Sequence, residues 1–436
     1  MTLERPEPGS SADPVDPVDA VDLSAGPSIP RPTAALIGVV SVAAAVGAGH
    51  LAAALVAPAA SPPLAVGGAV VRLTPLPLVE FATSTFGTAD KLVLLTGVGV
   101  LLVVVAALAG LASRRRAGPA VAVVVALGVV AGAAARTAPA FAQLDLAPPL
   151  AATIAGVVAV RWLHSRALRA PAHDRAGDPG APRDPGGDPE DDAVVTRRRV
   201  LGGSAAALGI VGAAALASGA AGQLLGRGVG DSRAEVERRL AAARVTPAPP
   251  VPPGADLAAF GAPPVVTPNA DFYRIDTALS VPQVSRGDWR LRIHGMVDRE
   301  VTLSFDDLQR FELVEQIVTL TCVSNPVGGD LISNAKWTGY RVRDLLAEVG
   351  IHADADMVLS TSVDGFTAGT PVEALTDQRD SLLAIGMNGA PLPTEHGYPA
   401  RLVVPGLYGY VSATKWLADL ELTRFDHAEA YWTKLG

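Results

Sequence analysis

The chain has 436 residues, and its composition excludes several classes of protein before any motif is considered. Hydrophobic residues make up 49% of it, and the excess lies in long uncharged stretches of the first half that are typical of membrane spans. One cysteine is present, which excludes disulfide scaffolds and multi-cysteine zinc sites. The formal net charge is −8, with acidic residues clustered in low-complexity segments, so we predict no nucleic-acid partner.

The first part of the chain predicts a tail followed by membrane spans. Residues 1–33 repeat Asp, Pro and Val without an amphipathic period, and we expect a disordered cytoplasmic tail. An apolar helix of about 20 residues crosses roughly 30 Å of hydrocarbon. We therefore assign residues 34–165 to a transmembrane region of four helices, with spans at 34–57, 92–112 and 119–135 and a shorter one at 150–163.

A fifth span is predicted after a polar interruption. Residues 166–196 are rich in Pro, Gly and Asp and predict a disordered linker. Residues 197–226 predict a fifth transmembrane helix, whose start at Arg197-Arg198-Arg199 resembles a twin-arginine export signal, although Val200 and Gly202 depart from that pattern. Anchoring by positive charge alone is the alternative interpretation. A Pro-rich linker is predicted over 227–268.

The arginines predict the orientation, because cations in short loops stay on the cytoplasmic side. Arg114 to Arg116 follow the second span. Arg161, Arg166 and Arg169 lie at the end of the fourth, and Arg197 to Arg199 precede the fifth. These clusters share one side only if the N-terminus is cytoplasmic. Five spans then place the domain after residue 226 outside the cytoplasm, at the cell membrane.

Residues 269–425 predict one α+β domain, with a C-terminal tail at 426–436. Helical spacing that ends at Gly350 predicts a helix over 340–349, and Ser304 is positioned to cap a short one through Phe311. Alternating or continuous apolar runs predict strands at 289–294, 301–303, 313–321, 357–362, 381–387, 400–404 and 417–422. The predicted fold class is α+β, preceded by an all-α transmembrane region of about five helices.

Cys322 lies where the predicted strand over 313–321 ends in a loop. A nucleophilic cysteine requires a histidine base. The domain offers His294, His352, His396 and His427, and the sequence alone places none of them beside the thiol. Taken by itself, Cys322 is either a small buried hydrophobe or a reactive thiol.

Motifs in a fixed order surround Cys322: Thr321-Cys322-Val323-Ser324-Asn325-Pro326, Lys336-Trp337-Thr338-Gly339, His396-Gly397-Tyr398-Pro399-Ala400-Arg401 and Gly409-Tyr410-Val411-Ser412-Ala413-Thr414-Lys415-Trp416. Together they resemble the sulfite oxidase family of molybdopterin enzymes, over about residues 269–423. The architecture is closest to the bacterial periplasmic methionine sulfoxide reductase branch. The resemblance implies a molybdenum–molybdopterin cofactor, with Cys322 as metal ligand and catalytic residue. A soft thiolate suits such a metal.

The resemblance also implies which residues bind the cofactor. Arg401 offers a planar fork and Lys415 a point charge to the anionic phosphate of the pterin. Ser362 and Asp364 match further pterin contacts of the family, with an ordinary turn as the alternative. The complete implied set is Asn269, Phe272, Tyr273, Ser362, Asp364, His396, Arg401, Ser412, Ala413, Thr414 and Lys415.

The loop after Cys322 lacks the arginines that bind the substrate anion in sulfite oxidases, which argues against sulfite as the substrate. Lys336, Arg341 and Arg343 are alternative anion partners, with solvent-facing charge as the plainer interpretation. We expect a membrane-anchored molybdopterin oxidoreductase that catalyses two-electron oxygen-atom transfer on a small substrate outside the cytoplasm, by sulfoxide-like reduction or oxyanion oxidation. The alternative is a membrane-anchored, non-catalytic binding or scaffold module that retains this fold.

The spans offer poor ligands for an intrinsic haem, because His50 and His164 are predicted to lie toward opposite faces of the membrane. We therefore predict no haem, and a separate membrane or quinone-linked electron donor or acceptor. The other expected partners are the lipid bilayer and a small-molecule substrate, with a monomeric catalytic domain. Residues 60–90 are expected to be a plain interhelical loop, with a cover over the catalytic face as the alternative.

Overall fold

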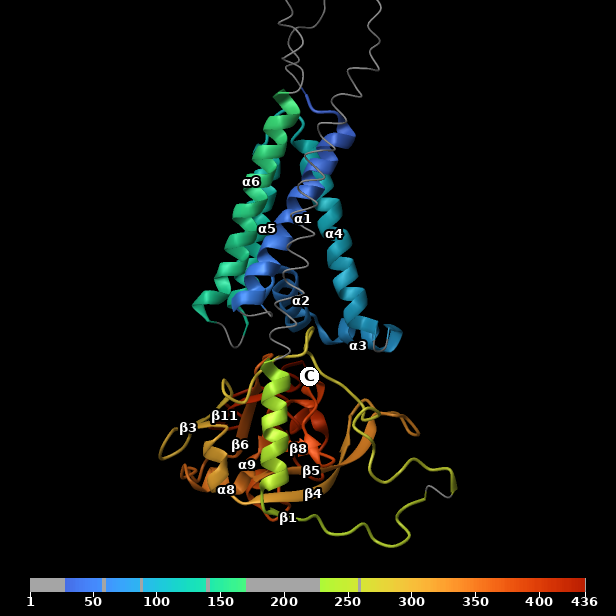
Figure 1. Ribbon diagram of the computed structural model, residues 1–436, viewed down its shortest axis with the longest axis vertical. Helices are drawn as coiled ribbons and strands as arrows, with labels where there is room; N and C mark the ends of the chain where they lie inside the picture. Colours follow the sequence, from blue (N-terminus) through green and yellow to red (C-terminus); the bar gives the residue numbers. More distant parts are fainter. Residues whose placement is uncertain are drawn as a thin grey trace, which may run out of the picture.

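The computed structural model describes residues 28–56, 60–86, 89–138, 142–169, 228–257 and 260–435. These residues form a helical bundle and a mixed-sheet domain that lies against one end of the bundle (Figure 1). The predicted fifth span at 197–226, with its twin-arginine-like start, lies outside the described residues. So do residues 1–27 of the predicted tail and residues 170–196 of the predicted linker.

Within the described residues, four helices are long and apolar enough to cross a membrane. They are α1 (Arg31–Val56), α4 (Asp90–Ala112), α5 (Gly118–Arg136) and α6 (Ala147–Arg169), which follows the 3-10 turn η3 (Gln143–Leu146). The first three match the predicted spans to within a few residues. The fourth is longer than predicted, with 23 residues, because two prolines open its first turn, where their missing N–H groups cost nothing.

Helices α1 and α4 approach each other through two glycines. A Cβ atom at Gly38 would collide with the carbonyl oxygen of Ala106, and one at Gly110 would collide with that of Ala34. Small residues at such positions let membrane helices pack backbone to backbone, where lipid provides no hydrophobic driving force. Gly38 and Gly110 therefore let α1 and α4 pack closely near the end of the bundle remote from the mixed-sheet domain.

We expect Gly110→Ala to lower the stability of the bundle, by about 1–3 kcal/mol if the helices must separate to admit the methyl group. The apparent melting temperature of the detergent-purified protein measures this. Gly99→Ala is the matched control on the same helix, because nothing lies within 4 Å of its Cβ position. Equal melting temperatures for the two variants would contradict the close packing of α1 against α4.

The described part of residues 60–90 is mostly helical, which differs from the predicted loop. It contains α2 (Pro62–Leu73) and α3 (Leu76–Phe86). Two prolines at the start of α2 favour helix initiation, and alanines of α2 pack on alanines of α5. Both helices lie at the end of the bundle that faces the mixed-sheet domain, where Gly67 of α2 lies against the side chain of Leu279 (Figure 1).

Two sheets share one hydrophobic core in the mixed-sheet domain. The first has the order β1-β4-β5-β8-β10, with β9 paired to β8: β1 (Val245–Thr246), β4 (Leu313–Thr321), β5 (Ile332–Arg341), β8 (Leu382–Met387), β9 (Ala390–Pro391) and β10 (Arg401–Val403). The second has the order β3-β2-β11-β6-β7: β2 (Arg290–Gly295), β3 (Val301–Ser304), β6 (Met357–Ser362), β7 (Thr367–Pro371) and β11 (Leu417–Thr423). Short helices and 3-10 turns connect the strands: α8 (Val342–Ala347), α9 (Val372–Thr376), η5 (Asp307–Arg310), η6 (Thr394–His396), η7 (Gly409–Val411) and η8 (Thr433–Leu435).

Each predicted strand is present, and β4 and β6 have the predicted bounds. Strands β5 and β7 and the two-residue strands β1 and β9 were not predicted. β5 buries consecutive residues from Trp337 to Tyr340, so the alternation that identifies a half-buried strand stops midway along it. It pairs antiparallel with β4 from Leu313 opposite Tyr340 to Thr321 opposite Ile332. The Cys322 loop is therefore the connection between two paired strands, which fixes both of its ends.

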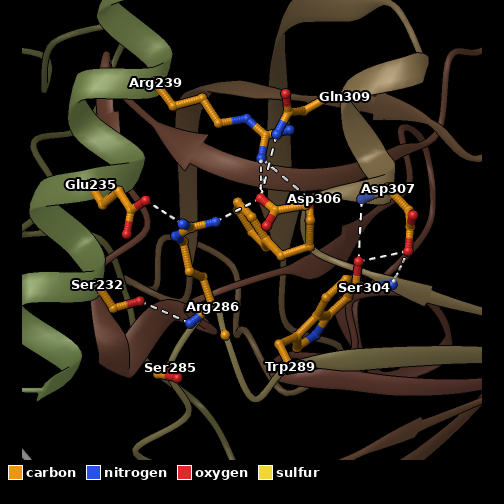
Figure 2. Close-up of polar contacts among 12 residues, drawn as sticks. Ser232, Glu235, Arg239, Ser285, Arg286, Trp289, Ser304, Asp306, Asp307 and Gln309 are labelled. Carbon is orange, nitrogen blue, oxygen red and sulfur yellow. Dashed lines mark hydrogen bonds and ion pairs between the residues drawn. The ribbon is translucent and has the colours of Figure 1, made fainter.

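Residues from 228 onward include part of the mixed-sheet domain, which corrects the first part of the predicted linker over 227–268. A helix over residues 228–242 buries Val229 and Val236 in the core of the domain. Arg286 connects this helix to the rest of the domain (Figure 2). Its backbone N–H donates to Ser232 Oγ of the helix at 2.8 Å, and its guanidinium pairs with Glu235 of the helix and, at 2.6 Å, with Asp306. The prolines after residue 246 had obscured a helix that ends just before them.

The C-terminal residues also belong to the domain, in contrast to the predicted tail at 426–436. Ala430 is buried, and the backbone N–H of Tyr431 donates to the Thr367 hydroxyl of β7 at 2.9 Å. These residues extend the packing of the second sheet past the last strand.

Candidate functional site

The Cys322 loop leaves the end of β4 and meets two other segments of the chain. The N–H of Cys322 donates to the carbonyl of Leu331 at 2.9 Å, so the loop stays closed at its base. The Tyr273 hydroxyl and the Thr321 carbonyl lie 3.8 and 3.9 Å from the Cβ position of Gly409. The half-buried thiol is thus placed where the segments around Tyr273 and Gly409 converge.

Arg401 begins β10 and is buried. Its Nη1 and Nη2 atoms donate to the carbonyls of His396 at 3.0 Å and Ala413 at 3.2 Å, and its guanidinium lies 5.0 Å from the centre of the Trp337 ring. Among the described residues, no carboxylate lies within ion-pair distance of it. Burial lowers the pKa of Arg401 to about 10, so the group stays cationic at neutral pH.

Lys415 lies beside Arg401 because the chain turns at Gly397. A Cβ atom at Gly397, which has a φ of 109°, would lie 3.1 Å from both Arg401 Cβ and Lys415 Cα. Lys415 Nζ donates to Asp276 Oδ2 at 2.7 Å and to the carbonyl of Glu395 at 3.1 Å. Burial lowers the pKa of Lys415 to about 8, against the opposing attraction of Asp276.

His396 is a neutral group in this cluster. Burial lowers its pKa to about 4, and the cationic Arg401 and Lys415 act in the same direction. Its Nε2 atom lies 3.3 Å from the carbonyl of Asn269. Because a carbonyl only accepts, Nε2 carries the proton and Nδ1 remains as an acceptor. His396 therefore contributes hydrogen bonding and not charge.

The segment from Asn269 to Tyr273 forms one wall of the cluster. Phe272 stacks on Tyr273 and packs edge-on against Trp337 and His396. The side-chain oxygen of Asn269 accepts from Asn388 Nδ2 at 2.7 Å. Burial raises the pKa of Tyr273 to about 12, so its hydroxyl keeps its proton and is a donor.

The remaining predicted residues are held by local contacts around the same cluster. Ser412 Oγ donates to the carbonyl of Tyr408 at 3.0 Å, and Thr414 Oγ1 lies 2.7 Å from Ser360 Oγ. Ser362 is the last residue of β6 and pairs with Leu417 of β11. Its hydroxyl accepts from the N–H of Asp364 at 3.3 Å, which is the local turn predicted as the alternative for this pair. Asp364 also accepts from Thr277 at 3.3 Å.

Two residues join the site without having been singled out from the sequence. Asp276 is 3% exposed and contacts Lys415, Arg274 and Lys91. An aspartate in an irregular segment carries no periodicity that would identify it. Lys91 lies in the predicted membrane region, and no local pattern relates it to Asp276, which is 185 residues away along the chain.

The cluster fits a bound anionic group. A buried guanidinium without a carboxylate is costly unless a negative charge joins it. Arg401 satisfies its donors with neutral carbonyls and the face of Trp337, and Lys415 lies alongside. A phosphate is an anion that both groups bind well. The Cys322 thiol lies in the same region, so one ligand with a phosphate end and a metal end matches the donor set.

Comparisons with known proteins agree with this donor set. A family described as the oxidoreductase molybdopterin binding domain matches residues 278–432. The chain is 34% identical over 148 residues to the uncharacterized oxidoreductase YuiH of Bacillus subtilis, covering 34% of this chain and 71% of that protein. The chain belongs to the sulfite oxidase family of molybdopterin oxidoreductases. It is therefore an oxidoreductase with a molybdopterin-binding domain.

Other members of the sulfite oxidase family match a smaller share of their own length. The mitochondrial sulfite oxidase of Rattus norvegicus is 32% identical over 193 residues, covering 39% of this chain and 35% of that protein. Among solved structures, the sulfane dehydrogenase SoxCD from Paracoccus pantotrophus is 28% identical, covers 37% of this chain and 44% of that chain, and has a TM-score of 0.35. This chain thus spans about a third of the length of the rat sulfite oxidase.

We expect anion binding at the Arg401–Lys415 cluster to weaken as the pH rises above about 8. An anion prefers the protonated form of Lys415, whose pKa in the free protein is about 8. Each further pH unit then reduces the affinity by up to about tenfold. Titration of the cofactor-free protein with pyrophosphate between pH 6.5 and 9.5 measures this. Lys415→Met should bind pyrophosphate more weakly at pH 7, and its affinity should no longer fall above pH 8. An unchanged fall in affinity above pH 8 would show that another group causes it.

Proposed function

We propose that this chain is a membrane-anchored molybdenum–molybdopterin oxidoreductase that catalyses two-electron oxygen-atom transfer on a small substrate outside the cytoplasm. The observation that carries the proposal is the buried, carboxylate-free charge of Arg401 near the Cys322 loop. The alternative, a non-catalytic module with the same fold, has no use for a half-buried thiol at that position.

The residues of the chain divide the work of such a site. Cys322 would hold the metal through its thiolate, while Arg401 and Lys415 would bind the phosphate of the pterin. Bound there, the cofactor supplies the two-electron oxygen-atom chemistry. Phe272 and Trp337 exclude water from the Arg401 side, and neutral His396 keeps Nδ1 as an acceptor. The protonated hydroxyl of Tyr273 is a donor on the Cys322 side.

The substrate that we propose is a small uncharged oxide of the sulfoxide type. The cations considered as anion partners already have carboxylates: Lys336 pairs with Glu315 at 3.0 Å, and Arg343 with Asp380 at 2.7 Å. The Cys322 loop exposes Val323 and Val327 and carries an acidic Asp330. These features disfavour oxyanion substrates such as sulfite and nitrate, which appear in the names of two relatives, sulfite oxidase and nitrate reductase.

The proposal is tested with purified protein whose molybdenum and pterin contents are measured first. A reduced viologen dye then reports oxidation by methionine sulfoxide or another S- or N-oxide, and a ferricyanide assay reports oxidation of sulfite. We expect turnover with a sulfoxide, and a loss of at least about a thousandfold in Cys322→Ala, because a metal ligand and the reacting centre are lost together. Wild-type protein without stoichiometric molybdenum and pterin would contradict the proposal. Retained turnover in Cys322→Ala would show that the thiolate is not required for catalysis.

We propose that the mixed-sheet domain lies outside the cytoplasm. Arginines gather at the end of the bundle remote from this domain: Arg114 to Arg116 follow α4, and Arg161, Arg166 and Arg169 lie near the end of α6 (Figure 1). The start of α4 contacts the domain through Lys91, so the 23 residues of α4 separate the two ends. Positive charge stays in the cytoplasm, which supports this orientation.

A tag at the C-terminus tests the orientation. In spheroplasts of cells expressing the full chain, protease should remove the tag without detergent, because the domain faces outward. A tag after Met1 should survive until the membrane is dissolved and serves as the matched control. Protection of the C-terminal tag in intact spheroplasts would invert the proposed topology.

We further propose that electrons reach or leave the site through a separate membrane or quinone-linked partner. His50 Nδ1 lies 2.9 Å from Ser61 Oγ near the domain side of the bundle, whereas His164 Nε2 lies 2.8 Å from the carbonyl of Ser113 at the far end of α4. These two histidines are not placed as a facing pair, which is the arrangement that a membrane b-type haem requires.

A further inference from the structure

A membrane helix reaches the cofactor side of the oxidoreductase domain through one lysine. Lys91 lies in the first turn of α4 and donates from Nζ to Asp276 Oδ1 at 2.7 Å and to the carbonyl of Ala278 at 2.8 Å. The lysine is partly exposed, at 31%, whereas Asp276 is 3% exposed. The ion pair is therefore closed off from solvent on the side of the domain.

Asp276 is shared between this membrane lysine and the cofactor lysine. Its Oδ2 atom accepts from Lys415 Nζ at 2.7 Å and from Arg274 Nε at 2.8 Å. Burial alone would raise the pKa of Asp276, but Lys415, Arg274 and Lys91 together hold it well below its usual range. The carboxylate is thus an anion whose charge is divided among three cations.

The hydrogen bonds of Lys415 leave one donor available. An ammonium group has three N–H bonds. Two of those of Lys415 go to Asp276 and to the carbonyl of Glu395. The third has no hydrogen-bond acceptor among the described residues, where the ammonium group lies 4.8 Å from the centre of the Trp416 ring, so it can be given to a ligand. Asp276 orients the ammonium group of Lys415, but its negative charge also repels a phosphate that binds there. A cation that neutralises Asp276 therefore favours phosphate binding.

We propose that Lys91 is a positioning residue for the cofactor phosphate. By neutralising Asp276 from the membrane side, it lets the carboxylate orient Lys415 without repelling the anion, so that cofactor retention depends on the docking of α4. This inference rests on the proposed function, because it takes the ligand of Arg401 and Lys415 to be the pterin phosphate. It makes the helical bundle a part of the cofactor site as well as an anchor.

The test measures how fast the holoenzyme loses its cofactor. Full-length protein is purified in detergent, and molybdenum and pterin remaining with it are followed during dialysis against a chelator. Lys91→Met and the smaller neutral Lys91→Gln should release both about fivefold faster than wild type, the size expected for one partly exposed ion pair. Lys91→Arg should stay within about twofold of wild type, because it restores the charge.

Arg72→Met is the matched control. Arg72 lies on α2 near the same end of the bundle, but it donates to Thr137 and does not contact Asp276. It should release cofactor at the wild-type rate. Thermal unfolding of each variant confirms that the bundle is intact, and the neutral variant that melts closer to wild type is the one compared.

Specific outcomes overturn the inference. If Lys91→Met and Lys91→Gln both release the cofactor at the wild-type rate, the charge of Lys91 does not affect cofactor retention and the inference is wrong. Equal acceleration in Lys91→Arg or in Arg72→Met would assign the effect to packing or to the bundle in general. Each of these results leaves the proposed function standing. Wild-type protein that never contains molybdenum and pterin would instead overturn the proposed function and this inference together.

Discussion

A buried positive charge without a carboxylate partner is the constraint around which the oxidoreductase domain is arranged. Arg401 enters the core at the start of β10, where desolvation of a guanidinium costs several kcal/mol unless other groups compensate. The carbonyls of His396 and Ala413 and the ring of Trp337 provide part of that compensation. The proposed cofactor phosphate would provide the rest. The distant segments that meet at Arg401 do so because each contributes a carbonyl, an aromatic face or a second cation.

The same constraint extends to the membrane bundle. Lys415 is also buried, and it keeps its charge through Asp276, which in turn is neutralised by Arg274 and by Lys91 of α4. A chain of alternating charges therefore runs from the membrane helix to the cluster near Cys322. A plain tether between the two parts would leave their relative position open. Here the ion pairs and the contact of Gly67 with Leu279 define it.

Patterns that are local in the sequence were predicted well, and those that depend on distant partners were not. Strands β4 and β6 were predicted with the correct bounds, because a continuous or alternating hydrophobic pattern indicates a strand without knowledge of its partner. The strand β5 was not predicted, since it buries Thr338 and Gly339 between β4 and β8 and its alternation stops at Trp337. The helix over residues 228–242 was hidden by the prolines that follow it, although Val236 is fully buried.

The sequence by itself determined the long apolar helices and the α+β class, and its ordered motifs around Cys322, His396, Arg401 and Lys415 resemble those of the sulfite oxidase family, which implied the cofactor. The helices and the fold class follow from composition and periodicity, and the resemblance follows from the order of the motifs; all of these are properties of the linear chain. Only the tertiary structure decided that Arg401 lacks a carboxylate, that Asp276 joins Lys415 to Lys91, and that the bundle contacts the domain. Such pairings arise from packing between residues far apart in the chain, and the burial that gives each charge its energetic weight exists only once the chain is folded.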